Sequence, residues 1–171
     1  TIVSAAEILK NNDEIKIVMV GSGSRSSFLK EEVDKRCLSN LIVAGRYPSD
    51  MMPAIFNYSQ VLLVSLAKKD SLSWTVPCKV QAYFAAGKPV LASLDGEGAR
   101  IVNESGAGRV CPAEDSHSLA ASILELYAMS DIERSEMGKK GRMYAERHYH
   151  PTKIAKQLHS YFLTMIKNEG K

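Results

Sequence analysis

The stretch CKVQAYFAAGKPVLASL, residues 78–94, decides the class of fold, because it joins a helix to a strand through one glycine. Its first part, up to Ala86, consists mostly of small and apolar residues and favours a helix. Gly87 suits the left-handed conformation that commonly ends a helix. The run KPVLASL that follows is short and apolar, as expected of a buried strand. The sequence therefore predicts a helix that turns directly into a strand of the core.

The same alternation continues on both sides of this stretch. Further strands are predicted at residues 15–20, 40–45, 60–67 and 106–111. Helices are predicted at residues 1–10, 27–37, 49–59, 97–105, 115–129, 131–148 and 152–166. Because strands and helices alternate strictly up to Cys111, we expect an α/β, Rossmann-like parallel sheet of about five or six strands. Helices should cover both of its faces, and a helical tail should end the chain.

Composition limits the classes of function. The chain has 171 residues, 45% hydrophobic and 24% charged, which is typical of one globular domain. A net charge of +3 fits an anionic small ligand or a nearby anionic membrane surface. Basic residues form no stripe with interleaved aromatic residues, so we expect no nucleic-acid partner. The three cysteines lack any CxxC spacing, which argues against a disulfide framework or a zinc site and favours a reducing compartment.

The order of the elements bears on domain organisation. A doubly wound domain normally opens on a strand that carries its first phosphate loop. Here the apolar positions of residues 1–10 fall at helical spacing instead. We therefore expect a fragment whose first strand is missing.

The first predicted strand runs into the glycine-rich sequence VGSGSRSS, residues 20–27. Glycine-rich backbone at the start of a helix suits an anion such as phosphate, here at Gly21 and Gly23. The same glycines fit a tight turn that needs their backbone freedom, and both interpretations stay open. A dinucleotide site is disfavoured, because Ser26 stands where a third glycine is expected and no acidic residue ends the next strand.

The next two strands also run into loops with candidate ligand contacts. GRYPSD, residues 45–50, offers Tyr47 for stacking on a base, or forms a loop that leads to an N-cap at Ser49 or Asp50. WTVPCK, residues 74–79, combines an aromatic ring, a hydroxyl, helix-start amides and Lys79, which together suit a diphosphate. The alternative is a proline at the first helical position, with a surface lysine and a tryptophan that packs the loop. We favour the diphosphate, because ligands of open α/β sheets bind at the carboxyl ends of strands.

For two further motifs, DGEG and HYH, we prefer a structural role to a role in ligand or metal binding. Glu97 in DGEG, residues 95–98, is a ligand for a hydroxyl group or, as we prefer, a carboxylate that caps the next helix. HYH, residues 148–150, suggests metal, but side chains two residues apart on a helix face different directions. We therefore expect a polar helix end there and no metal site.

These residues resemble a known family. PCKVQAYFAAGKPVLA, DGEGARIVNESGAGRVCPAEDSHSLAASILEL and MGKKGRMYAERHY are similar to the C-terminal half of a family 4 glycosyltransferase with the GT-B fold. Upstream, AAEILKNNDEIKIVMVGSGSRSSFLKEEV agrees, so the resemblance covers essentially the whole chain. The variant around VPCKVQAYFAAGKPVL looks most like bacterial transferases of cell-surface polysaccharide synthesis, including those that add N-acetylated deoxysugars such as fucosamine.

The resemblance implies an enzyme of two Rossmann-like domains that face a cleft. Residues 1–150 would form the nucleotide-sugar-binding domain without its first strand, and residues 151–171 a helix that crosses to an absent, acceptor-binding N-terminal domain. The donor would be bound by Gly21, Gly23, Arg46, Tyr47, Trp74, Thr75, Val76, Lys79 and Glu97. No catalytic residue is identifiable in this part, and we expect it to be inactive alone.

The implied reaction moves a sugar, an N-acetylated hexosamine or deoxyhexosamine, from a UDP-sugar to a glycan or lipid-linked acceptor. The product would belong to a polysaccharide such as lipopolysaccharide or capsule. The UDP-sugar is the substrate, and neither a cofactor nor a metal is expected. The implied place is the bacterial cytoplasm, with peripheral association of the whole protein at the inner face of the membrane.

One departure from the family pattern keeps other functions open. Many members carry two glutamates eight residues apart, and alignment on AAGKPV places those positions at Trp74 and Ala82. Loss of both carboxylates makes a non-catalytic nucleotide-sugar-binding subunit an alternative. A UDP-sugar 2-epimerase is a second alternative, since such isomerases share the GT-B fold. It would be expected to show more acidic groups for proton transfer than this chain does.

Overall fold

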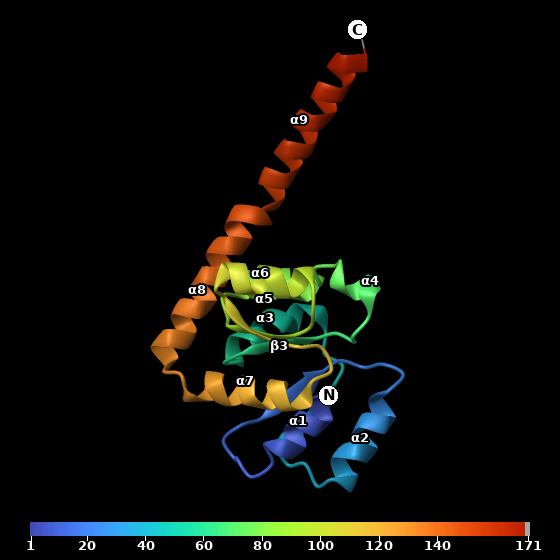
Figure 1. The fold of residues 1–171 in the computed structure, drawn as a ribbon, viewed down its shortest axis with the longest axis vertical. Coiled ribbons are helices and arrows are strands. Elements are labelled where there is room, and N and C mark those ends of the chain that lie inside the picture. Colours follow the sequence, from blue (N-terminus) through green and yellow to red (C-terminus); the bar gives the residue numbers. More distant parts are fainter. Residues whose placement is uncertain (170–171) are drawn as a thin grey trace.

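The computed structural model describes residues 1–169 and contains parallel strands flanked by helices (Figure 1). The strands are β1 (Ile17–Val20), β2 (Leu41–Gly45), β3 (Leu62–Ser65), β4 (Val90–Ser93) and β5 (Gly108–Cys111). The helices are α1 (Ile2–Ile8), α2 (Ser26–Lys35), α3 (Met52–Tyr58), α4 (Asp70–Ser73), α5 (Cys78–Ala86), α6 (Glu97–Ser105), α7 (Ser116–Ala128), α8 (Asp131–His148) and α9 (Pro151–Glu169), with a short 3-10 turn η1 (Ser49–Met51) before α3. The α/β class and the helical tail are thus as predicted.

The expectation of one continuous sheet is wrong. The strands form two parallel ladders, β1-β2 and β3-β4-β5, and within the described residues no ladder joins β1 to β3. In the doubly wound order 3-2-1-4-5-6, the two ladders correspond to strands 3-2 and strands 4-5-6. The position of strand 1 lies between them. In that order β2 and β3 lie on opposite sides of this position, although they follow each other along the chain.

Helices cover both faces of the three-stranded ladder. On one face α5, α6 and α8 pack around Phe84, with Val64 and Ala92 of the strands below them. On the other face α1 and α7 bury Leu91 and Cys111. Figure 1 shows α5 and α6 on the opposite side of the strands from α7 and α1. The alternate strand residues thus point into two cores, as expected of a parallel sheet buried on both faces.

The turn from α5 into β4 forms as the sequence predicts. Gly87 caps α5 with φ of +69°, a left-handed conformation that glycine adopts without strain. Gly138 of α8 lies directly on this turn, since a Cβ there would come within 2.1 Å of the carbonyl oxygen of Gly87. Tyr144, six residues further along α8, meets the ring of Phe84 edge-on at 5.7 Å between centroids. Backbone contact and ring packing together fix α8 against α5.

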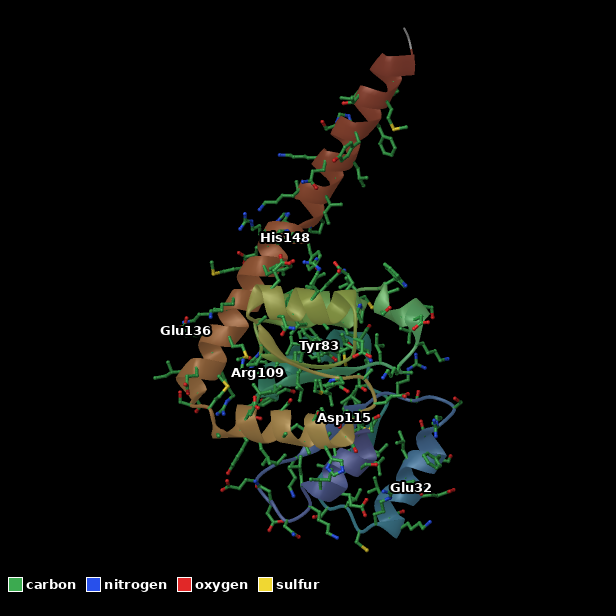
Figure 2. All side chains as sticks on the ribbon, viewed as in Figure 1. Glu32, Tyr83, Arg109, Asp115, Glu136 and His148 are labelled. Atoms are coloured by element: carbon green, nitrogen blue, oxygen red, sulfur yellow. The ribbon has the colours of Figure 1, made fainter. Side chains whose placement is uncertain are left out.

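Two polar side chains of the helices, those of Tyr83 and His148, also make contacts within the domain. Tyr83, labelled in Figure 2, points from α5 toward β3, where its hydroxyl donates to the carbonyl oxygen of Leu63 at 3.5 Å. Burial raises the pKa of this phenol. The ring of His148 lies 4.3 Å from that of Tyr144 at the end of α8, so the HYH motif is a polar helix end. Among the described residues no three His, Cys, Asp or Glu side chains are grouped to hold a metal ion.

Helix α9 extends away from the rest of the molecule (Figure 1). We expected an apolar stripe on it, formed by Ile154, Leu158, Tyr161, Met165 and Ile166, to be poorly covered. The exposed fractions of these side chains run from 39% at Ile154 to 70% at Tyr161, which confirms the expectation. No helix within residues 1–169 is long and apolar enough to cross a bilayer.

Phe84→Ala should destabilise the domain by about 3–5 kcal/mol, because it removes a fully buried ring that contacts both α8 and the sheet. Urea unfolding followed by circular dichroism measures this change. The matched control is Phe28→Ala, whose ring is 45% exposed on α2 and should cost less than about 1 kcal/mol. Equal losses in the two variants would contradict the assignment of the core.

Candidate functional site

Three loops meet at the carboxyl ends of β3, β4 and β5. The amide of Leu66 donates to the carbonyl oxygen of Ser93 at 3.0 Å, and that of Leu94 to Cys111 at 3.2 Å, so pairing continues just past the strands. Asp95 then accepts from the amide of Ala113 at 3.2 Å. The loops after these strands are therefore held side by side at the edge where open α/β sheets bind ligands.

The loop after β3 folds into a compact turn that the sequence did not predict. Residues 70–73 form the short helix α4, which is not among the helices predicted from the sequence. The hydroxyl of Ser73 donates to the carbonyl oxygen of Asp70 at 2.7 Å, and that of Thr75 to Leu72 at 2.9 Å. Serine and threonine hydroxyls compete in this way with longer regular structure, which explains a turn of helix that ends at once. The Thr75 hydroxyl is thus used inside the turn.

Trp74 lies at the end of this turn, and its side chain is 84% exposed. The alternative that Trp74 packs the loop is therefore wrong. Val76, two residues later, does pack against the core formed around Phe84. The exposed indole is left available to a ligand at the carboxyl edge of β3.

Helix α5 begins immediately after this turn. Its N-cap is Pro77, so the proline precedes the first helical residue, one position earlier than the alternative interpretation required. Cys78 and Lys79 are the first two helical residues, so Lys79 lies at a helix start as predicted, and its side chain is exposed. The first amides of a helix have no partner inside it and carry partial positive charge. Together with Lys79 they form a cationic helix start.

The DGEG loop after β4 lies against both ends of the segment from Ser73 to Pro77, which joins α4 to α5. Gly96 contacts the backbone of Ser73, and Gly98 contacts Pro77 and Leu94. Gly96, not Glu97, is the N-cap of α6, so the preferred capping role of Glu97 is wrong. Both carboxylate oxygens of Glu97 accept from the Arg100 guanidinium, at 2.6 and 2.8 Å, and these hydrogen bonds lower the pKa of Glu97. A ligand hydroxyl would share this carboxylate with Arg100.

A cavity of about 120 Å³ opens between the loops after β3 and β4. Its polar lining includes Lys68, Lys69, Asp70, Ser73 and Asp95. The sequence analysis did not single out Lys68, Lys69 or Asp95 as candidate site residues. The available signal was position, since all three residues directly follow predicted strands.

The loop after β5 carries a carboxylate that is already in use. Asp115, labelled in Figure 2, caps α7 by accepting from the amide of Ser118 at 3.0 Å and from its hydroxyl at 2.6 Å. These hydrogen bonds lower the pKa of Asp115. Asp115 is thus a structural cap at this edge of the sheet.

The remaining predicted residues form a second group at the ends of β1 and β2. The amide of Gly21 donates to Gly45 at 2.7 Å, which joins the two loops. The Ser26 hydroxyl bonds both backbone groups of Gly23, as in a tight turn. Arg46 and Tyr47 are exposed and line a hollow of about 510 Å³.

The loop from Gly45 does not lead directly to a capped helix, as the alternative interpretation of GRYPSD supposed. The predicted N-cap at Ser49 or Asp50 is wrong, since η1 intervenes and α3 begins after Met51 with no side-chain cap. In the part of the chain that the structure describes, no hydrogen bond or ion pair joins the second group to the region around Trp74 and Lys79.

Comparison with known proteins defines the family. Residues 1–129 match the family model for glycosyl transferases group 1. The probable glycosyltransferase WbjE of Pseudomonas aeruginosa is 29% identical over 154 residues, which are 86% of this chain and 36% of that protein. The chain therefore belongs to the group 1 glycosyl transferases.

Solved structures agree on the fold. A glycosyltransferase from Rickettsia africae superposes with a TM-score of 0.83 at 17% identity, over 97% of this chain and 44% of that one. Anabaena HepE, solved in complex with UDP and glucose, superposes with a TM-score of 0.75 at 15% identity, over 95% of this chain and 44% of that one. The fold is thus the C-terminal domain of a GT-B glycosyltransferase, and the chain spans less than half the length of these relatives.

The exposure of Trp74 is directly testable. The fluorescence of Trp74 is the part of the signal that is lost in Trp74→Phe. Acrylamide should quench this part about as strongly in the native protein as in urea, because the native indole is already 84% exposed. Strong protection in the native state, without added ligand, would contradict the geometry of the turn.

Proposed function

We propose that this chain is the donor-binding part of a glycosyltransferase that uses a UDP-sugar. The observation that carries the proposal is one juxtaposition at the carboxyl edge of β3 and β4. The cationic start of α5, with Lys79, lies next to the exposed Trp74 and to the DGEG loop. Helix-start amides and a lysine suit a diphosphate, while an exposed ring suits a base or a sugar face.

Each predicted residue then has a role. The amides of α5 and Lys79 bind the diphosphate, and Thr75 and Val76 shape the turn that leads to it. Glu97 accepts from the ribose hydroxyls. The residues that follow β1 and β2 bind the other end of the donor. Tyr47 stacks on the base beside Arg46, and Gly21 and Gly23 allow the ligand to approach the backbone closely.

The relatives favour a nucleotide donor. HepE was solved with UDP and glucose, and WbjE is named a probable glycosyltransferase. We propose that the donor carries an N-acetylated hexosamine or deoxyhexosamine. The acceptor is a glycan or a lipid-linked glycan, and the product a bacterial surface polysaccharide such as lipopolysaccharide or capsule. Neither a cofactor nor a metal ion takes part.

The proposal includes a second domain. Residues 1–150 form the donor domain, and α9 carries the chain toward an acceptor-binding domain that covers its apolar stripe. One more parallel strand fills the position between β1 and β3. Three observations support this: the split sheet, the exposed stripe, and relatives more than twice as long as the chain. The whole enzyme works in the cytoplasm at the inner face of the membrane.

Product analysis tests the proposal. The intact enzyme, incubated with UDP-N-acetylhexosamines and a lipid-linked glycan, should lengthen the acceptor and release UDP. The present chain alone should transfer no sugar, because transfer requires donor and acceptor in one near-attack geometry. An isomerised UDP-sugar with unchanged acceptor would indicate a 2-epimerase. UDP binding with no product would indicate a non-catalytic subunit. That alternative is motivated by Trp74 and Ala82, which stand at the two positions where many family members carry glutamate.

Lys79→Ala in the intact enzyme should weaken the donor about ten- to a hundredfold in kcat/KM, since a hydrogen bond to a charged group is worth about 1.5–3 kcal/mol. Steady-state kinetics measure this loss. The matched control is Lys139→Ala, an exposed lysine on α8 that pairs with Glu136 far from the sheet edge. A change below about twofold at Lys79 would show that this lysine is merely solvated.

Glu97→Ala should weaken UDP far more than Gln81→Ala does. A buried ribose diol needs an acceptor, and an unpaired hydroxyl costs about 1–3 kcal/mol. Gln81 is half-buried in α5, one residue from Ala82, and points about 100° away from it around the helix. Calorimetric titration of UDP compares the two variants. A dominant loss at Gln81 would contradict the alignment that places Ala82 at a glutamate position.

A further inference from the structure

The two glycines of the DGEG loop touch the two ends of one short segment, residues 73–77. A Cβ at Gly96 would lie 2.0 Å from the carbonyl oxygen of Ser73 and 2.6 Å from its Cα. A Cβ at Gly98 would lie 3.1 Å from Cδ of Pro77 and 3.0 Å from Cδ1 of Leu94. Between Ser73 and Pro77 stand Trp74, Thr75 and Val76, the predicted donor contacts.

Gly96 is constrained in two separate ways. Its φ of +74° and ψ of −140° lie in a region that residues with a side chain rarely adopt. Its contact with Ser73 involves backbone atoms, which cannot rotate out of the way as a flexible side chain does. Any side chain at this position would therefore strain the loop or push the 73–77 segment outward.

Hydrogen bonds brace the first part of this segment, from Ser73 to Thr75, against the turn before it. The amides of Leu72 and Ser73 both donate to the carbonyl oxygen of Lys69, at 3.0 and 3.2 Å. The amide and hydroxyl of Thr75 both donate to Leu72, at 3.3 and 2.9 Å. A displacement at Ser73 is therefore transmitted to Trp74 and Thr75, because few torsions between them are left unconstrained.

From this geometry we propose that Gly96 and Gly98 are positioning residues: they seat the 73–77 segment on the β4–α6 loop and the first turn of α6, and so fix where the exposed Trp74 stands relative to the start of α5. The link to UDP affinity rests on the proposed function. The positioning itself does not, since it concerns only contacts within this chain.

Gly96→Ala in the intact protein tests the proposal, with Trp74 as a local reporter. The protein is labelled with 5-fluorotryptophan, and the Trp74 signal is assigned by its loss in Trp74→Phe. Gly96→Ala should shift or split this ¹⁹F resonance without ligand and raise the Kd for UDP about tenfold, which is the loss expected when one hydrogen bond to a charged ligand group is displaced.

Gly106→Ala is the matched control. Gly106 also has a positive φ, +62°, but it caps the opposite end of α6, where a Cβ would meet only the side chain of Lys140, at 3.3 Å. This variant also puts a side chain at positive φ, in the milder left-handed region, so its melting temperature should fall, while the Trp74 resonance and the Kd for UDP should stay as in the wild type.

If Gly96→Ala fails to fold, Gly98→Ala replaces it, because its new methyl group meets side-chain atoms and should shift the same resonance by less. The proposal would be overturned if Gly96→Ala, or Gly98→Ala in its place, had the same Trp74 resonance and the same UDP affinity as the Gly106→Ala control. Absence of UDP binding by the wild type would instead overturn the proposed function, and the ¹⁹F comparison would still decide the positioning.

Discussion

The burial of β4 is the constraint on which the rest of the structure depends. All four of its residues are buried, and it pairs along both edges, with β3 on one side and β5 on the other. Its connections are tight at both ends, which keeps few unpaired backbone groups next to the core. Gly87 supplies the entry and Gly96 the exit, each with positive φ.

Close backbone packing follows from that central strand. Gly108 of β5 lies so near Val90 that a Cβ would come within 1.8 Å of its carbonyl oxygen, and a Cβ at Gly138 would come within 2.1 Å of that of Gly87. These two glycines thus set how closely β5 approaches β4 and how closely α8 approaches the turn that leads into it. With these distances fixed, the loops after β3, β4 and β5 have little freedom, and their polar residues converge at one edge.

The two-stranded ladder contrasts with this rigid part. Val18 of β1 and Ile42 of β2 pair with each other and are 53% and 44% exposed, whereas the opposite side of the ladder packs on α1 and α2. Its group of candidate residues around Arg46 and Tyr47 is correspondingly separate from the Trp74 region. Apolar surface left uncovered on strands and on α9 is surface that further protein normally covers.

The sequence by itself determined the fold class, the α5–Gly87–β4 turn, the bounds of α6 and the position of Lys79 at a helix start. Those features depend on local periodicity and on residues with special backbone preferences, which are readable along the chain. Only the tertiary structure decided that the sheet is split, that Glu97 pairs with Arg100 while Gly96 caps α6, and that Lys68, Lys69 and Asp95 line one cavity. These depend on which loops become neighbours, and strand order in space is not written in strand order along the chain.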